Sequence, residues 1–149
     1  MIQYLRVSLK KLLDQNSLYL AWLIAAVSTA GSLYFSEIAK FTPCNLCWYQ
    51  RIVMYPLVAV LAVGIIRKDR STPYFVLPLS LIGSLIALYH ELLNIGAISE
   101  PITPCGLGVS CTTRYINWFG FVSIPLLSLL AFVTISALMV YLIKRYSTR

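Results

Sequence analysis

Charged side chains are scarce in this 149-residue chain: they make up 11% of the sequence, and only five residues are acidic. A soluble domain carries about 25% charged residues, and so few cannot cover a water-facing surface. Hydrophobic residues make up 59% of the chain. The composition therefore excludes an ordinary soluble domain and indicates an integral membrane protein.

The shortage of acidic residues leaves a formal net charge of +7. Such an excess could indicate a nucleic-acid-binding protein, but the basic residues do not gather in one patch. They flank the ends of apolar stretches, which is the pattern that sets the orientation of membrane proteins. We therefore expect no nucleic-acid partner.

Four long apolar stretches lie at about 15–36, 48–66, 73–90 and 118–142. Each is long enough to cross a bilayer, which needs about 17–25 residues. A cleavable signal peptide is the alternative for the first stretch, but its apolar region would be shorter, and no clear small-x-small cleavage site follows. The sequence predicts an all-α membrane protein, a four-transmembrane-helix bundle with short cysteine-bearing outer loops. We expect outer loops at 37–47 and 93–117 and cytoplasmic segments at 1–14, 67–72 and 143–149.

Basic residues are divided unequally between the two ends of these stretches. Nine belong to the termini and the second loop: Arg6, Lys10, Lys11, Arg67, Lys68, Arg70, Lys144, Arg145 and Arg149. Three belong to the opposite side: Lys40, Arg51 and Arg114. Because cytoplasmic loops carry the excess of Lys and Arg, both termini are expected in the cytoplasm and both cysteine-bearing loops outside.

Two cysteines three residues apart precede the second apolar stretch. Thr42 is a good N-cap, and Pro43 suits the first position of a helix. A helix that begins there places Cys44, Cys47 and Arg51 at i, i+3 and i+7, on one face in successive turns. The helix N-terminus and a nearby arginine both favour a thiolate over a thiol. This spacing predicts a redox-active pair, provided that it faces solvent or an electron acceptor.

All four cysteines lie in the expected outer loops, where disulfides persist, and the natural pairs are Cys44–Cys47 and Cys105–Cys111. As structural staples, pairs that close such short loops would each contribute only about 2 kcal/mol. A zinc site made of all four cysteines is chemically possible. However, thiolate zinc sites favour reducing compartments, so we expect no metal. The third interpretation, which we favour, is thiol–disulfide exchange between the two pairs.

Electrons that reach Cys44 and Cys47 need an acceptor, and a lipid-soluble quinone can approach the bilayer edge where these cysteines lie. Arg51, one turn deeper, would stabilise a thiolate or a reduced quinone anion. The alternative is an interfacial arginine that extends its guanidinium towards water. His90 is the last residue of the third apolar stretch, at the same outer end as the cysteines. It is either a donor to quinone oxygens or an interfacial histidine with partners of its own.

Three stretches resemble the DsbB family of membrane thiol–quinone oxidoreductases, and especially its short BdbC-type branch. They are Cys44-Asn45-Leu46-Cys47-Trp48-Tyr49-Gln50-Arg51, the loop with Cys105 and Cys111, and Tyr115-Ile116-Asn117-Trp118-Phe119-Gly120-Phe121. With four spans and both termini inside, the resemblance covers nearly the whole chain. The second outer loop is shorter than in the better-known Gram-negative members. Gln50 stands where those members carry Glu, a difference to which we attach no mechanistic weight.

The resemblance implies a disulfide relay in a bacterial cell (inner) membrane. A reduced extracytoplasmic thioredoxin-fold thiol oxidase attacks Cys105 of the Cys105–Cys111 disulfide, and Cys111 then exchanges with Cys44. Cys47 meets menaquinone or ubiquinone from the lipid and quinone pool, with help from Arg51. The sequence thus predicts a thiol–quinone oxidoreductase for disulfide bond formation. The alternative is a non-catalytic membrane subunit or a metal-handling protein with structural cysteines.

Overall fold

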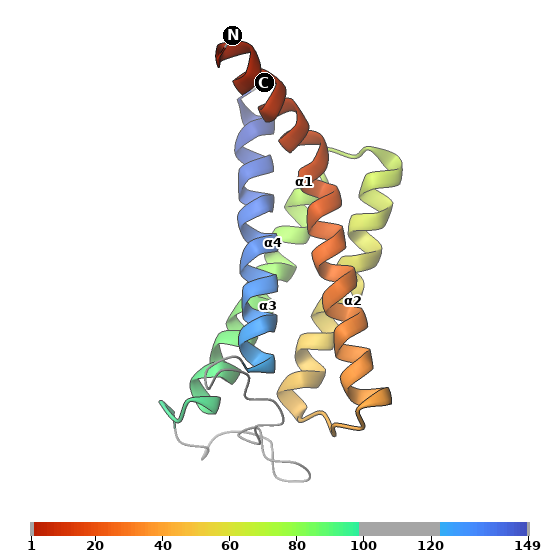
Figure 1. Ribbon diagram of the computed structural model, residues 1–149, viewed down its shortest axis with the longest axis vertical. Helices are drawn as coiled ribbons and strands as arrows, with labels where there is room; N and C mark the ends of the chain where they lie inside the picture. Colours follow the sequence, from red (N-terminus) through yellow and green to blue (C-terminus); the bar gives the residue numbers. More distant parts are fainter. Residues whose placement is uncertain (1, 99–122, 149) are drawn as a thin grey trace.

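The computed structural model of the chain describes residues 2–98 and 123–148. Its elements are α1 (Ile2–Leu33), the π-helical turn η1 (Tyr34–Ile38), α2 (Asn45–Arg67), α3 (Thr72–Asn94) and α4 (Ile124–Ser147). The four long helices form a bundle in which α1 and α3 each contact both α2 and α4 (Figure 1). Both chain ends lie at one end of the bundle, and the α1–α2 connection lies at the other (Figure 1). The prediction of an all-α four-helix bundle is confirmed over the described residues.

The surface of this bundle is suited to lipid rather than to water. Among the described residues, four helical segments are long and apolar enough to cross a membrane, with mean hydropathies of 1.5 for Asn16–Ile38, 1.7 for α2, 1.7 for α3 and 2.5 for α4. Large apolar side chains point outward, among them Ile66, Phe75 and Leu85, which are 79%, 65% and 67% exposed. Water would make such exposure unfavourable by about 25 cal/mol per Å². The chain is therefore a multi-pass membrane protein.

Each helix turns one apolar stripe towards the bundle interior. Leu57 and Leu61 of α2 are fully buried one turn apart, and Ile135 and Met139 of α4 repeat the same spacing. This i, i+4 recurrence is expected when one helical face packs against neighbouring helices. The described interior thus has one long apolar core that runs along the bundle and a second, smaller cluster at the cysteine end, formed by Cys44, Leu46 and Leu93.

Gly83 allows α3 and α4 to approach closely. A Cβ atom at this position would overlap the ring of Phe132, which is fully buried on α4. Gly83→Ala is therefore expected to destabilise the protein in detergent by about 1–3 kcal/mol, the usual cost of overpacking, measured as a lower melting temperature. Gly31→Ala is the matched control, because nothing lies within 4 Å of a Cβ at position 31. Equal melting temperatures for the two variants would contradict the close α3–α4 contact.

Candidate functional site

The beginning of α2 carries both cysteines of the CxxC pair. Cys44 is the N-cap, with an extended backbone (φ −74°, ψ 170°), and α2 begins at Asn45. The prediction of an N-cap at Thr42 is therefore wrong by two residues, because the extended backbone of Cys44 keeps the preceding residues out of the helix. Cys47 and Arg51 still lie four residues apart on one face of α2.

The two sulfur atoms of this pair lie close to one another. Cys44 Sγ and Cys47 Sγ are 3.4 Å apart, and both cysteines are free thiols. Because a disulfide bond is about 2.05 Å long, a small movement of the side chains would close one. Cys44 is buried and Cys47 is half-buried, so the pair is accessible mainly from one side.

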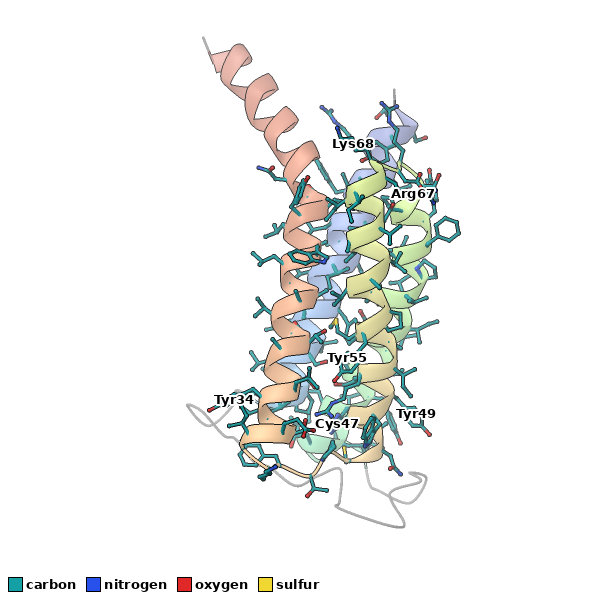
Figure 2. All side chains as sticks on the ribbon, turned by 90° about the vertical axis from the view of Figure 1, so that its right-hand side faces the viewer. Tyr34, Cys47, Tyr49, Tyr55, Arg67 and Lys68 are labelled. Atoms are coloured by element: carbon teal, nitrogen blue, oxygen red, sulfur yellow. The ribbon has the colours of Figure 1, made fainter. Side chains whose placement is uncertain are left out.

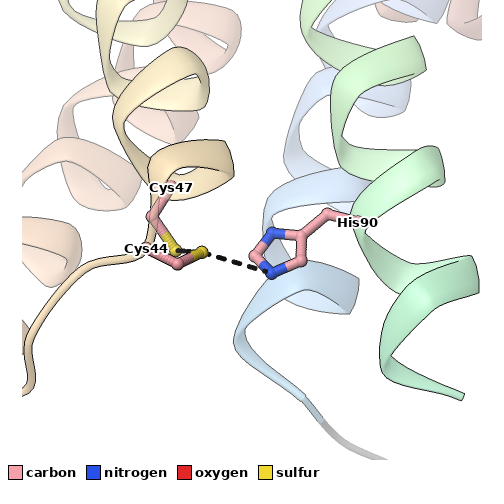
Figure 3. A group of neighbouring side chains, drawn as sticks. All are labelled: Cys44, Cys47 and His90. Atoms are coloured by element: carbon pink, nitrogen blue, oxygen red, sulfur yellow. Dashed lines mark hydrogen bonds between the residues drawn. The ribbon is translucent and has the colours of Figure 1, made fainter. Parts of the chain in front are cut away.

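His90, near the end of α3, faces the two cysteines (Figure 3). Its Nε2 lies 3.7 Å from Cys44 Sγ, and its Nδ1 lies 3.1 Å from Gln50 Nε2. When the Gln50 amide donates to Nδ1, the neutral ring carries its hydrogen on Nε2 and donates it to the Cys44 sulfur. His90 is only 3% exposed. The sequence left two interpretations of His90, a donor to a quinone or a histidine with partners of its own. The structure gives His90 partners within the protein, and one of these partners is a cysteine of the redox pair.

Cys44 lies just before the membrane-spanning segment of α2, and its surroundings favour the thiolate. The hydrogen bond from Cys47 is the largest cause that lowers the pKa of Cys44, and His90 lowers it further, whereas burial opposes both. Together they bring this pKa from 9.0 to about 4. In the reduced pair, Cys44 is therefore a thiolate at neutral pH, and the thiolate is the form that attacks disulfides.

The low pKa of Cys44 predicts a flat pH profile for its alkylation by iodoacetamide. In reduced protein with Cys105→Ser and Cys111→Ser, in metal-free buffer, the rate at Cys44 should stay level from about pH 8 to about pH 5 and halve at a pH of about 4. Peptide mapping by mass spectrometry measures this rate. Cys47→Ala removes the strongest cause and should move the midpoint upward. A rate that falls about tenfold per pH unit below neutrality, as for an ordinary thiol, would contradict the assignment.

Arg51 is anchored to α1 by Ser32. Its Nε donates to Ser32 Oγ at 2.9 Å and its Nη2 donates to the Ser32 carbonyl oxygen at 3.0 Å, while its guanidinium carbon lies 5.4 Å from the centre of the Trp48 ring. Ser32 lies just before η1, and its carbonyl oxygen has two lone pairs, so that it can accept a hydrogen bond from outside its own helix. Three of the five guanidinium N–H groups have no partner among the described residues. These groups are available to a ligand.

A cavity of about 400 Å³ lies at this end of the bundle. Its polar wall includes Cys44, Cys47, Arg51 and His90. Apolar and aromatic side chains make up much of the remaining wall: Val27, Phe35, Phe41, Met54, Tyr55 and Leu127. Small-molecule sites typically measure about 300–1,000 Å³. The cavity can therefore take a flat apolar molecule with its polar atoms beside a sulfur and a guanidinium.

The Glu91 carboxylate links α3 to the beginning of α4 beside this cavity. Ser123 Oγ donates to Glu91 Oε2 at 2.6 Å, and Asn94 Nδ2 donates to the same oxygen at 3.4 Å. Ser123 is also the N-cap of α4, where its side chain accepts from the backbone N–H of Leu126. The carboxylate thus joins the end of α3 to the beginning of α4.

Two contacts in the site were missed from the sequence. Gln50, to which we attached no mechanistic weight, is 8% exposed and holds His90. The available signal was a polar residue three positions after Cys47, on the same helical face of an apolar stretch. Ser32 gave no comparable signal, because a serine near the end of a spanning stretch is ordinary. The second cysteine pair, Cys105 and Cys111, lies outside the described residues, so its pairing stays a prediction.

The family model for disulfide bond formation protein DsbB matches residues 14–142. The chain belongs to the DsbB family. Disulfide bond formation protein C of Bacillus subtilis (strain 168) is 49% identical over 118 residues, which cover 79% of this chain and 86% of that protein. Probable disulfide formation protein C 1 of Bacillus anthracis is 48% identical over 132 residues, which cover 88% and 94%. No solved structure shows significant similarity to the chain.

The resemblance to the BdbC-type branch of the DsbB family is therefore confirmed. A more distant relative, the probable disulfide formation protein of Metapseudomonas resinovorans, is 40% identical over 131 residues, which cover 87% of this chain and 91% of that protein. As a DsbB-family member, the protein is a membrane oxidoreductase of disulfide bond formation.

Proposed function

We propose that this DsbB-family protein is a thiol–quinone oxidoreductase that reoxidises an extracytoplasmic thioredoxin-fold disulfide oxidase. Electrons pass from the partner to Cys105 and Cys111, then to Cys44 and Cys47, and finally to menaquinone or ubiquinone in the membrane. The observation that carries the proposal is the cavity, which brings the CxxC sulfurs and the free donors of Arg51 together within apolar walls at the bundle end.

The residues of the cavity fit a quinone headgroup. The apolar and aromatic walls match a flat ring, and the volume of about 400 Å³ accommodates the ring and the start of an isoprenoid tail. Arg51 offers N–H donors one turn from Cys47 and favours negative charge on a carbonyl oxygen placed beside it. When bound, a quinone accepts two electrons and two protons.

The reduced CxxC pair supplies both electrons and one of the two protons. As the Cys44 thiolate and the Cys47 thiol join in a disulfide, one S–S bond forms and the pair gives up two electrons and the Cys47 proton, so the second proton comes from water. His90 holds the Cys44 sulfur at 3.7 Å, whereas the half-buried Cys47 lies nearer to Arg51 along α2. This difference supports the assignment of Cys47 as the sulfur that meets the quinone and of Cys44 as the sulfur that exchanges with Cys111.

The redox requirement of the partner is consistent with a quinone acceptor. A strongly oxidising thioredoxin-fold protein, such as DsbA at about −120 mV, can be reoxidised only by an acceptor that is at least comparably oxidising. Membrane quinones meet this condition, and they reach the cavity from the lipid without passing through water. The respiratory chain then consumes the quinol.

The proposed orientation places the cysteines outside a bacterial cell membrane and both termini in the cytoplasm. Arg67 and Lys68 lie at the end of the bundle opposite Cys47 (Figure 2), and both termini lie at that same basic end (Figure 1). A basic end is retained on the cytoplasmic side. The Cys44–Cys47 pair would then lie where an extracytoplasmic partner can deliver electrons.

An anaerobic single-turnover experiment tests the proposal. Fully reduced protein, mixed with a short-chain quinone, should lose two thiols for each quinol formed, and mass spectrometry should locate a Cys44–Cys47 disulfide. Protein alkylated beforehand is the control and should form no quinol. Thiols and quinone that both persist after mixing would overturn the proposal and favour structural cysteines.

A further inference from the structure

We propose that the reduced protein contains a binding site for a thiophilic divalent cation such as Zn²⁺, formed by Cys44 Sγ, Cys47 Sγ and His90 Nε2. An ion at this site would hold both thiols as thiolates and would occupy the sulfur side of the cavity. The site differs from a zinc site made of four cysteines, because it combines one cysteine pair with a histidine from another helix.

The distances between the three ligand atoms already suit a tetrahedral ion. Zinc–sulfur bonds are about 2.3 Å and zinc–nitrogen bonds about 2.0–2.1 Å, which places two sulfurs about 3.8 Å apart and a sulfur and a nitrogen about 3.6 Å apart. The observed separations are 3.4 Å between Cys44 Sγ and Cys47 Sγ and 3.7 Å between Cys44 Sγ and His90 Nε2. All three ligand atoms lie within 4.8 Å of one another. The separation between Cys47 Sγ and His90 Nε2 would have to shorten by at most about 1.2 Å, which small movements of both side chains would supply.

Gln50 provides the support that metal-bound histidines usually have. A ligating imidazole almost always donates its other ring N–H to an acceptor, which fixes its tautomer and orientation. His90 Nδ1 lies 3.1 Å from the Gln50 amide. If the amide turns its oxygen towards Nδ1, the ring proton moves to Nδ1 and Nε2 becomes free to bind the ion. The same glutamine can thus serve both the metal-free and the metal-bound forms.

The surroundings favour retention of an ion and leave one coordination position open. His90 is 3% exposed and Cys44 is 8% exposed, so water has little access to two of the three ligands, whereas Cys47 is half-buried. Two thiolates neutralise a divalent cation, which reduces the cost of burying its charge. Two Cys and one His make a three-ligand set of the type that keeps a fourth position open, and here that position would face the cavity.

The site exists only while the cysteines are reduced. Binding needs both sulfurs as thiolates, so it displaces any proton that they carry, and it transfers no electron, whereas a Cys44–Cys47 disulfide offers no thiolate ligand. Metal capture would therefore compete with oxidation by the quinone. This inhibitory consequence rests on the proposed function, but metal binding itself does not.

The test uses the full-length protein with Cys105→Ser and Cys111→Ser, reduced and anaerobic in detergent, with Co²⁺ as a spectroscopic probe and Zn²⁺ as its competitor. We expect one Co²⁺ per chain, with thiolate-to-cobalt charge-transfer absorption and the visible bands of tetrahedral cobalt, and displacement by Zn²⁺. Gln50→Ala should weaken binding about 10–100-fold, the usual effect of losing a residue that supports a ligand. His90→Ala should weaken binding at least as much. Glu37→Gln, an exposed carboxylate in η1 at the same end of the bundle, is the control and should leave the affinity unchanged.

The outcomes separate this inference from the proposed function. Absence of the charge-transfer band, or equal affinity in wild type and His90→Ala, would overturn the metal site even if quinone reduction is normal. A cobalt site with these properties in a protein that never reduces quinone in metal-free buffer would leave the site standing and refute the proposed function. If the protein both binds the metal and reduces quinone, Zn²⁺ should stop quinone reduction reversibly, and EDTA should restore it. Quinone reduction that continues at saturating Zn²⁺ would overturn the inhibitory role.

Discussion

Cys47→Ser is expected to abolish quinone reduction, by at least about a thousand-fold, and to trap a disulfide between Cys44 and Cys111. In this variant the Cys44 thiolate can attack Cys111 of the Cys105–Cys111 disulfide, which forms a Cys44–Cys111 bond and releases the Cys105 thiol. No Cys47 thiol then lies 3.4 Å from Cys44 to displace Cys111 and close the Cys44–Cys47 disulfide. Non-reducing electrophoresis after acid quenching, followed by peptide mapping, measures the trapped species. Cys111→Ser should instead trap the partner on Cys105, because the Cys105 thiolate attacks the disulfide of the oxidised partner and no Cys111 thiol is present to release it.

Cys44→Ser is the matched control for this prediction. It should lose turnover to the same extent, yet accumulate no Cys44–Cys111 bond, because it removes the sulfur that bonds to Cys111. If all the cysteine variants only lowered stability and none trapped a mixed disulfide, the cysteines would be structural and the relay would be wrong.

Arg51→Ala is expected to raise the KM for quinone by about 10–100-fold. This range corresponds to one lost charge-assisted hydrogen bond of about 1.5–3 kcal/mol. The three guanidinium N–H groups without partners among the described residues are the groups that a quinone oxygen would meet. Initial rates of quinone absorbance loss at several quinone concentrations measure the effect.

Ser32→Ala separates the positioning of Arg51 from its charge. It removes the hydroxyl acceptor of Nε but keeps the backbone carbonyl that accepts from Nη2. We therefore expect a smaller rise in KM than for Arg51→Ala, and Arg51→Lys should lie between the two because a lysine keeps the charge without the planar fork. Quinone kinetics in Arg51→Ala identical to those of wild type, with an unchanged melting temperature, would remove Arg51 from the site.

The fold class and the position of the redox pair could be predicted from sequence because both depend on local patterns. Length and apolarity decide whether a helix can span a bilayer, and a helical repeat decides that Cys47 and Arg51 share a face. The N-cap was predicted at Thr42, two residues before its position at Cys44, because Thr42-Pro43 also satisfies the preferences for a helix start. Such preferences narrow a helix boundary to a few residues.

The partners of the site residues could not be predicted because they come from different helices. Gln50 and His90 are 40 residues apart, and Ser32 and Arg51 are 19 apart. Which side chains meet across helices depends on helix rotation and on the spacing that small residues allow. Neither quantity can be derived from the periodicity of a single helix.

Steady-state quinone reduction by the purified protein, with a reduced thioredoxin-fold oxidase as the electron donor, tests the central claim most directly. We predict one quinol per donor disulfide formed under anaerobic conditions, at a rate that requires Cys44, Cys47, Cys105 and Cys111. Donor oxidation without quinol formation, or quinol formation that persists after Cys44 and Cys47 are both replaced by serine, would contradict the account.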